Sequence, residues 1–370
     1  MAQQNRINEN CEPIGALQWF PTTNTDVYQN WLPCNGQTLS QSAYPALFSK
    51  IGLLNGPGSN WKYISLTATQ INSLLYSGSL FVAATALGGI YTSTDATTWT
   101  LQTSGTSSSI QALTYGNGLY VLCGAGGMIR SSTDAVTWSA VTSGTTTALA
   151  GAAYGVGAYI FYNTSNQIRT STDLSAWASA TSTSSTISRV AFVNNTFYYL
   201  TTNNAIGTST DGFTWSVSRP FGGFGGLGFT SISYGAGVYI ITTSANQILT
   251  TTDFSSYSVT QPSALSTSLP LRNSIYTGSY FLVCGDQGSI FTSLDGYTWN
   301  TFKSLSASSI ASLATSSTTA VCAGATGILF NSKYSYDTST QFQLPISDLN
   351  VAINSGNAFS FSKNLFIKAL

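Results

Sequence analysis

Histidine is absent from this 370-residue sequence, only 6% of the residues are charged, and the formal net charge is zero. Without histidine, neither a Ser-His-Asp nor a Cys-His catalytic arrangement can form. The chain also lacks the basic clusters that attract nucleic acid or an anionic membrane surface. These absences exclude the histidine-based hydrolases and predict no nucleic-acid partner.

Long apolar runs are also missing. No stretch of about 20 apolar residues predicts a transmembrane helix, and no basic start with an apolar stretch and a cleavage site predicts a signal peptide. Ser, Thr, Asn, Gly and Tyr take the places that Lys and Glu usually fill. Such a composition suits an extracellular or virion surface.

Cysteine is scarce and odd in number, with five residues at Cys11, Cys34, Cys123, Cys284 and Cys322. The last three recur at one register of an apolar segment, which indicates core packing. Because no Cys-x-x-Cys pair and no histidine exist, we expect no disulfide framework, no metal site and no cofactor.

The most regular feature of the sequence is a repeated motif, Ser-x-Asp-x-x-Thr-Trp. Four copies fit the motif and two, at residues 171–177 and 251–257, are looser; the aspartates of all six are spaced 39, 39, 38, 42 and 42 residues apart. A repeat of about 40 residues indicates copies of one supersecondary unit. The six aspartates are Asp95, Asp134, Asp173, Asp211, Asp253 and Asp295.

Each repeat contains four segments of four to six residues, rich in β-branched and aromatic types and separated by Gly or Asn turns, as in residues 110–141. This pattern predicts four short antiparallel strands, the blade of a β-propeller. The three-strand part recurs seven times, beginning near Ile71, Ile110, Leu149, Ile187, Phe229, Leu271 and Ile310.

The fourth, aromatic strand also occurs seven times, but its first copy, at Trp61, precedes the first three-strand part. The fold class predicted is therefore all-β: a seven-bladed propeller over residues 56–335, closed by the Trp61 strand joining blade seven. Closure removes the open sheet edges of a linear stack.

The repeated turn resembles the Asp-box of sialidase-type propellers. That resemblance implies that the aspartate holds the hairpin between the third and fourth strands and that the tryptophan packs between blades. A binding or metal role for the aspartates is the alternative. The tryptophans concerned are Trp99, Trp138, Trp177, Trp215 and Trp299.

Catalytic carboxylates are lacking, since the two glutamates, Glu9 and Glu12, precede the propeller and Asp286 is its one aspartate outside the repeated turn. Paired carboxylates for acid–base work are therefore missing, and we predict a non-enzyme. Arg130 and Arg169 recur at one strand position, where they either line the channel or are exposed on the surface.

The two ends of the chain carry a second set of motifs. Residues 13–52 contain Pro-x-Gly at 13–15, Trp-Leu-Pro-Cys-Asn-Gly at 31–36 and Tyr-Pro-Ala-Leu-Phe at 44–48, and Phe-Gln-Leu-Pro follows at 342–345. The first three motifs resemble the first half of the phage tail-collar domain, and the last resembles its second half. We predict an N-terminal arm (1–10) and a collar-like domain split into 11–55 and 336–370 by the propeller. The motif residues are Gly15, Trp31, Cys34, Gly36, Tyr44, Pro45, Phe48, Gly52, Phe342 and Pro345.

Both predicted connectors leave from the face that carries the aspartate turns, so we place receptor binding on the opposite face. Two inter-blade loops there, 220–228 and 262–270, are longer than the rest. Exposed aromatics beside amides would suit a neutral glycan, whereas the alternative is that the Phe-Gly run packs over a blade junction. The candidate contacts are Phe221, Phe224, Phe229, Asn166, Gln167, Asn203, Asn204, Asn246 and Gln247.

The combined motifs predict a phage tail-fibre or tail-tip adhesin that binds a bacterial surface receptor, with a polysaccharide as the expected ligand. The alternatives are a structural or decorating virion protein and, third, a glycan-degrading enzyme. By resemblance to collar-type fibres we expect a homotrimer located in the virion tail, partnered by other tail, fibre or baseplate proteins.

Overall fold

The computed structural model describes residues 17–20, 31–33, 38–40, 42–44, 61–178, 181–221, 228–262, 269–302, 305–333, 341–343 and 364–368. The chain divides into two compact units. One comprises Met1–Asn60 with Lys333–Leu370, and the other comprises Trp61–Ser332.

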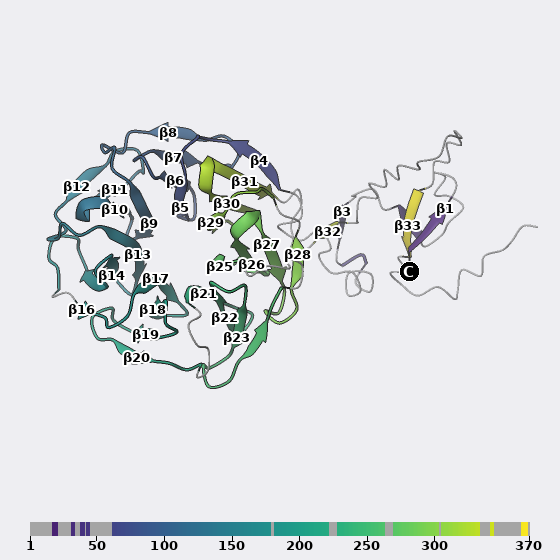
Figure 1. The fold of residues 1–370 in the computed structure, drawn as a ribbon. Coiled ribbons are helices and arrows are strands. Elements are labelled where there is room, and N and C mark those ends of the chain that lie inside the picture. Colours follow the sequence, from purple (N-terminus) through teal and green to yellow (C-terminus); the bar gives the residue numbers. More distant parts are fainter. Residues whose placement is uncertain are drawn as a thin grey trace, which may run out of the picture. The chain divides into compact units, whose positions relative to one another are not determined.

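The second unit is a ring of seven four-stranded antiparallel sheets (Figure 1), so the seven-bladed prediction is confirmed. Blade one contains β5 (Ile71–Tyr76), β6 (Phe81–Thr85), β7 (Ile90–Ser93) and β8 (Thr100–Gln102). Blade two contains β9 (Ile110–Gly116), β10 (Leu119–Gly124), β11 (Ile129–Ser132) and β12 (Ser139–Val141). Blade three contains β13 (Leu149–Gly155), β14 (Ala158–Asn163), β15 (Gln167–Ser171) and β16 (Thr181–Ser182).

The remaining blades repeat this order. Blade four contains β17 (Ile187–Val193), β18 (Thr196–Thr201), β19 (Ile206–Ser209) and β20 (Ser216–Ser218). Blade five contains β21 (Phe229–Gly235), β22 (Val238–Thr243), β23 (Ile248–Thr251) and β24 (Ser258–Thr260). Blade six contains β25 (Leu271–Tyr276), β26 (Phe281–Gly285), β27 (Ile290–Ser293) and β28 (Asn300–Phe302).

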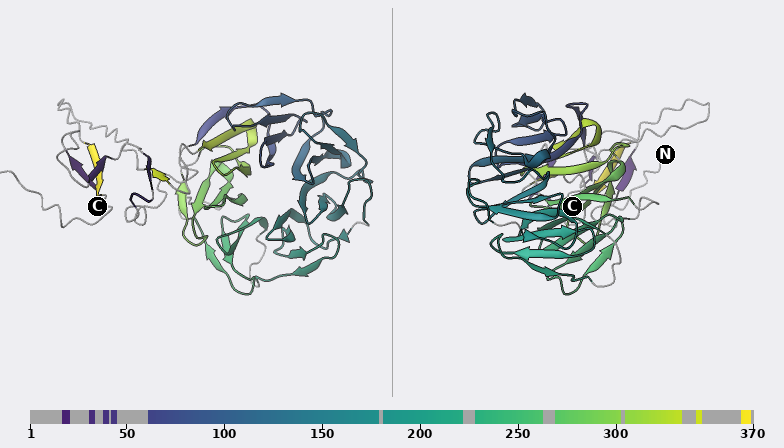
Figure 2. Two further views of the ribbon diagram at one scale, coloured as in Figure 1. Left: turned by 180° about the vertical axis from the view of Figure 1, so that it is seen from behind. Right: turned by 60° about the vertical axis from the view of Figure 1, so that its left-hand side comes forward.

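Blade seven is assembled from two distant parts of the chain. It contains β29 (Ile310–Thr315), β30 (Thr319–Gly324), β31 (Ile328–Lys333) and, as its outer strand, β4 (Lys62–Ser65). Strand β4 is antiparallel to β31, with Lys62 opposite Asn331 and Ser65 opposite Ile328. The views in Figure 2 show the same closed ring of sheets.

The core lies between neighbouring blades, because each sheet has an apolar face on both sides. The second strand of most blades is buried along its whole length, as in β6, β14, β22 and β30. These strands therefore consist almost entirely of apolar and small residues. One cluster joins Val82 and Ala84 of blade one to Leu122 and Trp138 of blade two.

Tight turns connect the first two strands in blades two to five. Asn117 and Gly118 both have positive φ, at 49° and 74°. Two consecutive residues of this kind form the type I′ turn that matches the twist of a hairpin. Among the described residues, the helical segments are single 3-10 turns, η2 (Ala125–Gly127), η3 (Asp286–Gly288) and η4 (Ala325–Gly327).

The first unit contains two small sheets built from both ends of the chain. In the three-stranded sheet, β33 (Asn364–Lys368) lies between β1 (Leu17–Phe20) and β2 (Trp31–Pro33). In the other, β3 (Thr38–Ser40) pairs with β32 (Gln341–Gln343), which sets Leu39 opposite Phe342. The segments before and after the propeller thus hydrogen-bond to each other.

Candidate functional site

The repeated aspartates lie in the turn between the third and fourth strands, here called the Asp turn. In blade two, Asp134 Oδ1 accepts hydrogen bonds from the backbone N–H groups of Val136 and Thr137, both at 2.8 Å, and from Ser132 Oγ at 2.8 Å. An aspartate that accepts bonds from the following backbone closes such a turn without a metal or ligand.

The same arrangement recurs around the ring. Asp211 accepts bonds from Phe213 N, Thr214 N and Ser209 Oγ, and Asp295 accepts bonds from Tyr297 N, Thr298 N and Ser293 Oγ. Asp95 and Asp173 repeat it, and Asp253 accepts from the backbone and hydroxyl of Ser255.

These hydrogen bonds favour the ionised carboxylate. The backbone N–H groups of Thr137 and Val136 lower the pKa of Asp134, and those of Thr214 and Phe213 lower the pKa of Asp211. For Asp295 burial acts in the opposite direction, but the bonds from Thr298 and Tyr297 outweigh it and lower its pKa. The carboxylates are thus engaged in the turns themselves.

The tryptophans that follow these turns lie against the blades. Trp138 is buried and its Nε1 donates to Ala135 O at 3.2 Å. Trp177 Nε1 donates to Thr142 O of the preceding blade at 2.8 Å. Trp99 and Trp299 pack against the apolar clusters of their blade junctions, and Trp215 packs at a tilt against Tyr199, with ring centroids 5.1 Å apart.

Two of the aromatic receptor candidates are not on the surface, which corrects their predicted role. Phe221 is 2% exposed and Phe229 is 0% exposed. Phe221 packs edge-on against Phe229, with centroids 5.9 Å apart, and against Tyr257 at 4.9 Å. Phe229 begins the innermost strand β21, where every blade has a large apolar residue, so the packing interpretation holds for both. Phe224 lies outside the described residues.

The amide candidates mostly bond within the protein, because they occupy the turns between second and third strands. Asn166 has a left-handed backbone with φ of 60°, and its Oδ1 accepts from Ile187 N at 3.2 Å. Gln167 Oε1 accepts from Asn163 at 2.9 Å. Asn203 is exposed, yet its amide donates to Ser185 Oγ at 2.8 Å.

Asn204 and Asn246 are buried, at 7% and 0% exposure, so the prediction that they offer surface amides is wrong. Both have left-handed backbone, with φ of 65° and 58°, at the position where other blades carry a glycine. Asparagine tolerates this conformation, and its side chain turns inward. Gln247 beside them is half-buried.

Arg130 and Arg169 line neither the channel nor an open surface. Both are half-buried on the third strands β11 and β15. The Arg130 guanidinium donates to the Gly105 carbonyl of the preceding inter-blade loop at 2.6 Å, and that of Arg169 lies 5.8 Å from the Trp177 ring centre. Arg130 thus contacts the loop before its blade, and Arg169 contacts an aromatic ring within its own blade.

A cavity of about 150 Å³ occupies the centre of the ring, where the first strands of the blades converge. Each first strand has a β-bulge at its second residue, so that its first and third residues pair with consecutive residues of the second strand. Bulges re-aim the side chains beside them. The third positions are Ser73, Ala112, Gly151, Arg189, Ser231, Asn273 and Ser312.

Six of these seven third positions are small or neutral, and one is an arginine. Ser73 and Ser312 serve the ring itself, because their hydroxyls accept from Leu113 N at 3.0 Å and Leu74 N at 2.8 Å of the next blade. Arg189 donates instead from Nη2 to Asn273 Oδ1 at 2.9 Å, from blade four to blade six. Arg189 is half-buried, and desolvation lowers the pKa of its guanidinium.

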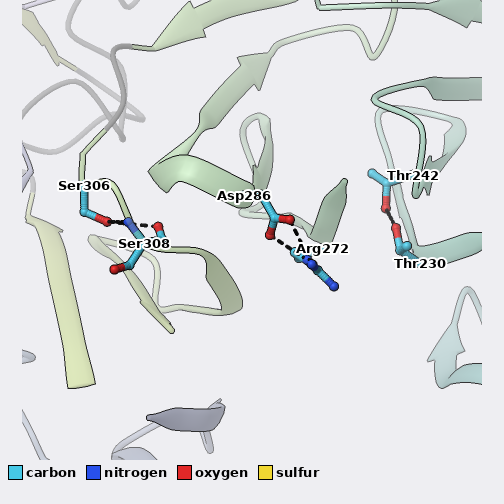
Figure 3. Close-up of polar contacts among 6 residues, drawn as sticks. All are labelled: Thr230, Thr242, Arg272, Asp286, Ser306 and Ser308. Carbon is cyan, nitrogen blue, oxygen red and sulfur yellow. Dashed lines mark hydrogen bonds and ion pairs between the residues drawn. The ribbon is translucent and has the colours of Figure 1, made fainter. Parts of the chain in front are cut away.

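The second arginine near this region, Arg272, is neutralised. Its Nε and Nη2 both bond to the Asp286 carboxylate at 2.8 Å (Figure 3). Asp286 and the inter-blade residues Ser306 and Ser308 belong to the side of the ring opposite the Asp turns. Sequence reasoning missed Arg189, although the aligned first strands distinguish it as the one charged third position.

A second depression lies at the rim of blade one. It is open and about 410 Å³ in volume, between the turn around Leu87 and the stretch from Leu101 to Ser107. Leu87 and Leu101 are 69% and 61% exposed. In the parts of the chain that the structure describes, no three Cys, Asp or Glu side chains gather in a metal-binding group. No described helix is long and apolar enough to cross a membrane.

The cysteines of the described part of the propeller, Cys123, Cys284 and Cys322, are buried. Desolvation raises the pKa of both Cys123 and Cys284 to about 12. A thiol that stays protonated at neutral pH is a poor nucleophile.

Comparison with known proteins assigns the beginning of the chain. Residues 15–65 match the Phage Tail Collar Domain. This collar match suggests a phage tail-fibre protein and a component of the virion tail, and it implies association with other phage tail proteins. The match extends from β1 to β4, and thus reaches the strand that closes the propeller.

The propeller resembles solved structures at low sequence identity. Virginiamycin B lyase from Staphylococcus aureus is 14% identical, with a TM-score of 0.64, covering 74% of this chain and 99% of that one. YCF48 from Cyanidioschyzon merolae is 14% identical, with a TM-score of 0.60, covering 74% and 98%. The WD40 propeller of Doa1 is 10% identical, with a TM-score of 0.61, covering 74% and 97%.

These likenesses show the fold alone. The search of curated proteins found no match to this chain.

Proposed function

We propose that this protein is a receptor-binding protein of a phage tail, in which the collar-like unit attaches to the virion and the propeller binds a bacterial surface glycan. The observation that carries the proposal is the collar match at residues 15–65 in the same chain as a propeller whose carboxylates are held in turns. A propeller presents a broad surface of loops on a rigid ring, which suits recognition.

The surface proposed for the receptor is the side of the ring opposite the Asp turns. The chain enters the propeller before β4 and leaves it after β31, at the sheet end where the other blades have their Asp turns. The opposite side carries no covalent connection. There, the depression at Leu87 and Leu101 combines apolar side chains with hydroxyls, a composition that can contact the faces and hydroxyl groups of a sugar.

The enzyme alternative has less support. A variant of virginiamycin B lyase in which one histidine is replaced by alanine is described as catalytically inactive. This chain has no histidine. Its propeller carboxylates, six in Asp turns and Asp286 beside Arg272, leave no pair for general acid and base catalysis.

An adsorption experiment tests the proposal. The purified full-length protein, labelled with a fluorophore, is expected to bind the host strain and to reduce phage adsorption in competition. Leu87→Asp and Leu101→Asp would place a charge in the depression and should weaken cell binding, whereas Val217→Asp, at an outer-strand residue with 62% exposure, serves as the matched control. Failure to bind cells or to compete with phage would contradict receptor binding.

Two further measurements separate the alternatives. If a phage lacking the propeller keeps its infectivity and host range, the propeller is structural or decorative. If incubation with host polysaccharide shortens the polymer on gel filtration, the protein is a glycan-degrading enzyme. A trimer, proposed from the collar resemblance, predicts a mass of three chains by light scattering.

A further inference from the structure

The charge balance of the propeller leaves one central cation without a carboxylate. Residues 61–332 contain seven acidic residues, of which six are in Asp turns and the seventh, Asp286, forms an ion pair with Arg272. Arg189 lies on the wall of the central cavity, and the described contacts give it one hydrogen bond, to the neutral Asn273. A guanidinium has five N–H donors.

Arg189 is half-buried, and a partly desolvated charge is costly unless an opposite charge or further hydrogen bonds compensate it. The walls around Arg189 are mainly polar, with amide side chains from Asn72, Gln111 and Asn273. Ala112 lines the cavity with a small side chain, whereas the Tyr162 ring occupies the space beside Gly151 and is itself part of the wall. The geometry is therefore that of a lone cation in a preformed polar cavity.

We propose that this cavity binds a small oxyanionic group, a carboxylate or a phosphate, on the Arg189 guanidinium. Guanidinium and these oxyanions form paired, charge-assisted hydrogen bonds. The volume of about 150 Å³ is below the range of about 300–1,000 Å³ typical of pockets that enclose a whole ligand. The occupant is thus a free small anion or one acidic substituent of a larger molecule.

Anion binding at this site can be tested independently of the receptor function, because simple anions serve as probes. If the receptor function also holds, the site favours an acidic glycan over a neutral one. A carboxylate and a phosphate share the required chemistry, so the experiment must distinguish these two sources.

Isothermal titration calorimetry of the full-length protein with acetate, glucuronate, inorganic phosphate and glycerol phosphate tests the proposal, with glucose as the neutral control. Binding of at least one anion is expected, and none of glucose. Tighter binding of glucuronate than of acetate assigns a carboxylated sugar, whereas tighter binding of glycerol phosphate than of inorganic phosphate assigns a phosphorylated group.

Variants locate the binding. Arg189→Gln is expected to weaken anion binding about tenfold or more, because it removes the charge. Arg219→Gln removes an exposed charge on the same propeller and should leave the affinity unchanged.

Asn273→Asp is the second variant, chosen because Asn273 Oδ1 already lies 2.9 Å from the arginine. It supplies the missing carboxylate with little change of shape, so the protein should fold and lose anion binding. Absence of binding to the wild-type protein, or equal binding to wild type and Asn273→Asp, would overturn the proposal. Glycan-array binding without anion binding would refute this site while leaving the receptor function intact.

Discussion

The Asp turns and the third positions of the first strands, which surround the central cavity, both recur in the blades. They differ in how strictly each blade keeps the same residue. Six turns keep the aspartate, because each carboxylate accepts the N–H groups that the turn exposes. The third positions of the first strands hold Ser, Ala, Gly or Asn in six blades, and Arg189 is the one charged residue among them. Regularity here marks support of the fold, and its single charged exception marks the candidate binding site.

The largest effect is expected in the core that both regions share. Phe229→Ala should destabilise the propeller by about 3–5 kcal/mol, because it empties a fully buried site between blades. Chemical denaturation measures the change. Phe213→Ala, at a 44% exposed residue of an Asp turn, should change stability by less than about 0.5 kcal/mol. Equal effects of the two would show that Phe229 is not a core residue.

Acid should act on the Asp turns rather than on the ring. The folded pKa values of Asp134, Asp211 and Asp253 lie below the ordinary value, so their contribution to stability is full above about pH 4 and declines as the pH falls through the folded values. Calorimetric melting between pH 7 and pH 2 measures this loss. Asp134→Asn should melt with a weaker dependence on pH, and an unchanged dependence would contradict the role of its ionised form.

The central cavity can be probed by removing the side chain that accepts the Arg189 hydrogen bond while the charge of Arg189 remains. Asn273→Ala should weaken anion binding about threefold to tenfold, since Arg189 loses one hydrogen bond worth about 1 kcal/mol. Titration with the best anionic probe measures this change. Asn300→Ala, an exposed residue of β28, is the control. Complete loss of binding would mean that Asn273, rather than Arg189, holds the anion.

The smallest effect is expected at the neutralised arginine. Arg272→Gln breaks the ion pair with Asp286, but the two side chains are 44% and 19% exposed, so the cost should be below about 1 kcal/mol. Denaturation midpoints measure it. A cost as large as that of Phe229→Ala would show that this pair, despite its exposure, is a main support of blade six.

The spacing of the aspartates predicted repeated blades, and the seven recurring three-strand parts with the early aromatic strand at Trp61 predicted the blade number, the four strands and the closure. Local chemistry carries that information, because turn residues and short β-branched strands act within one repeat. The surface candidates were less predictable. The sequence places Phe229 at the start of a first strand, which already favoured burial, whereas only the contacts of Phe221 with Phe229 and Tyr257 show that Phe221 is packed.

The blades, the Asp turns and the separate collar motifs could be predicted from the sequence alone, because each strand, turn or motif consists of residues close together in the chain. The tertiary structure decided which side chains meet across blades. Arg189 and Asn273 are 84 residues apart, and only ring closure brings them to 2.9 Å, while it leaves every propeller carboxylate outside the centre. Charge compensation is a property of the assembled ring, so no single repeat could show that Arg189 lacks a carboxylate partner.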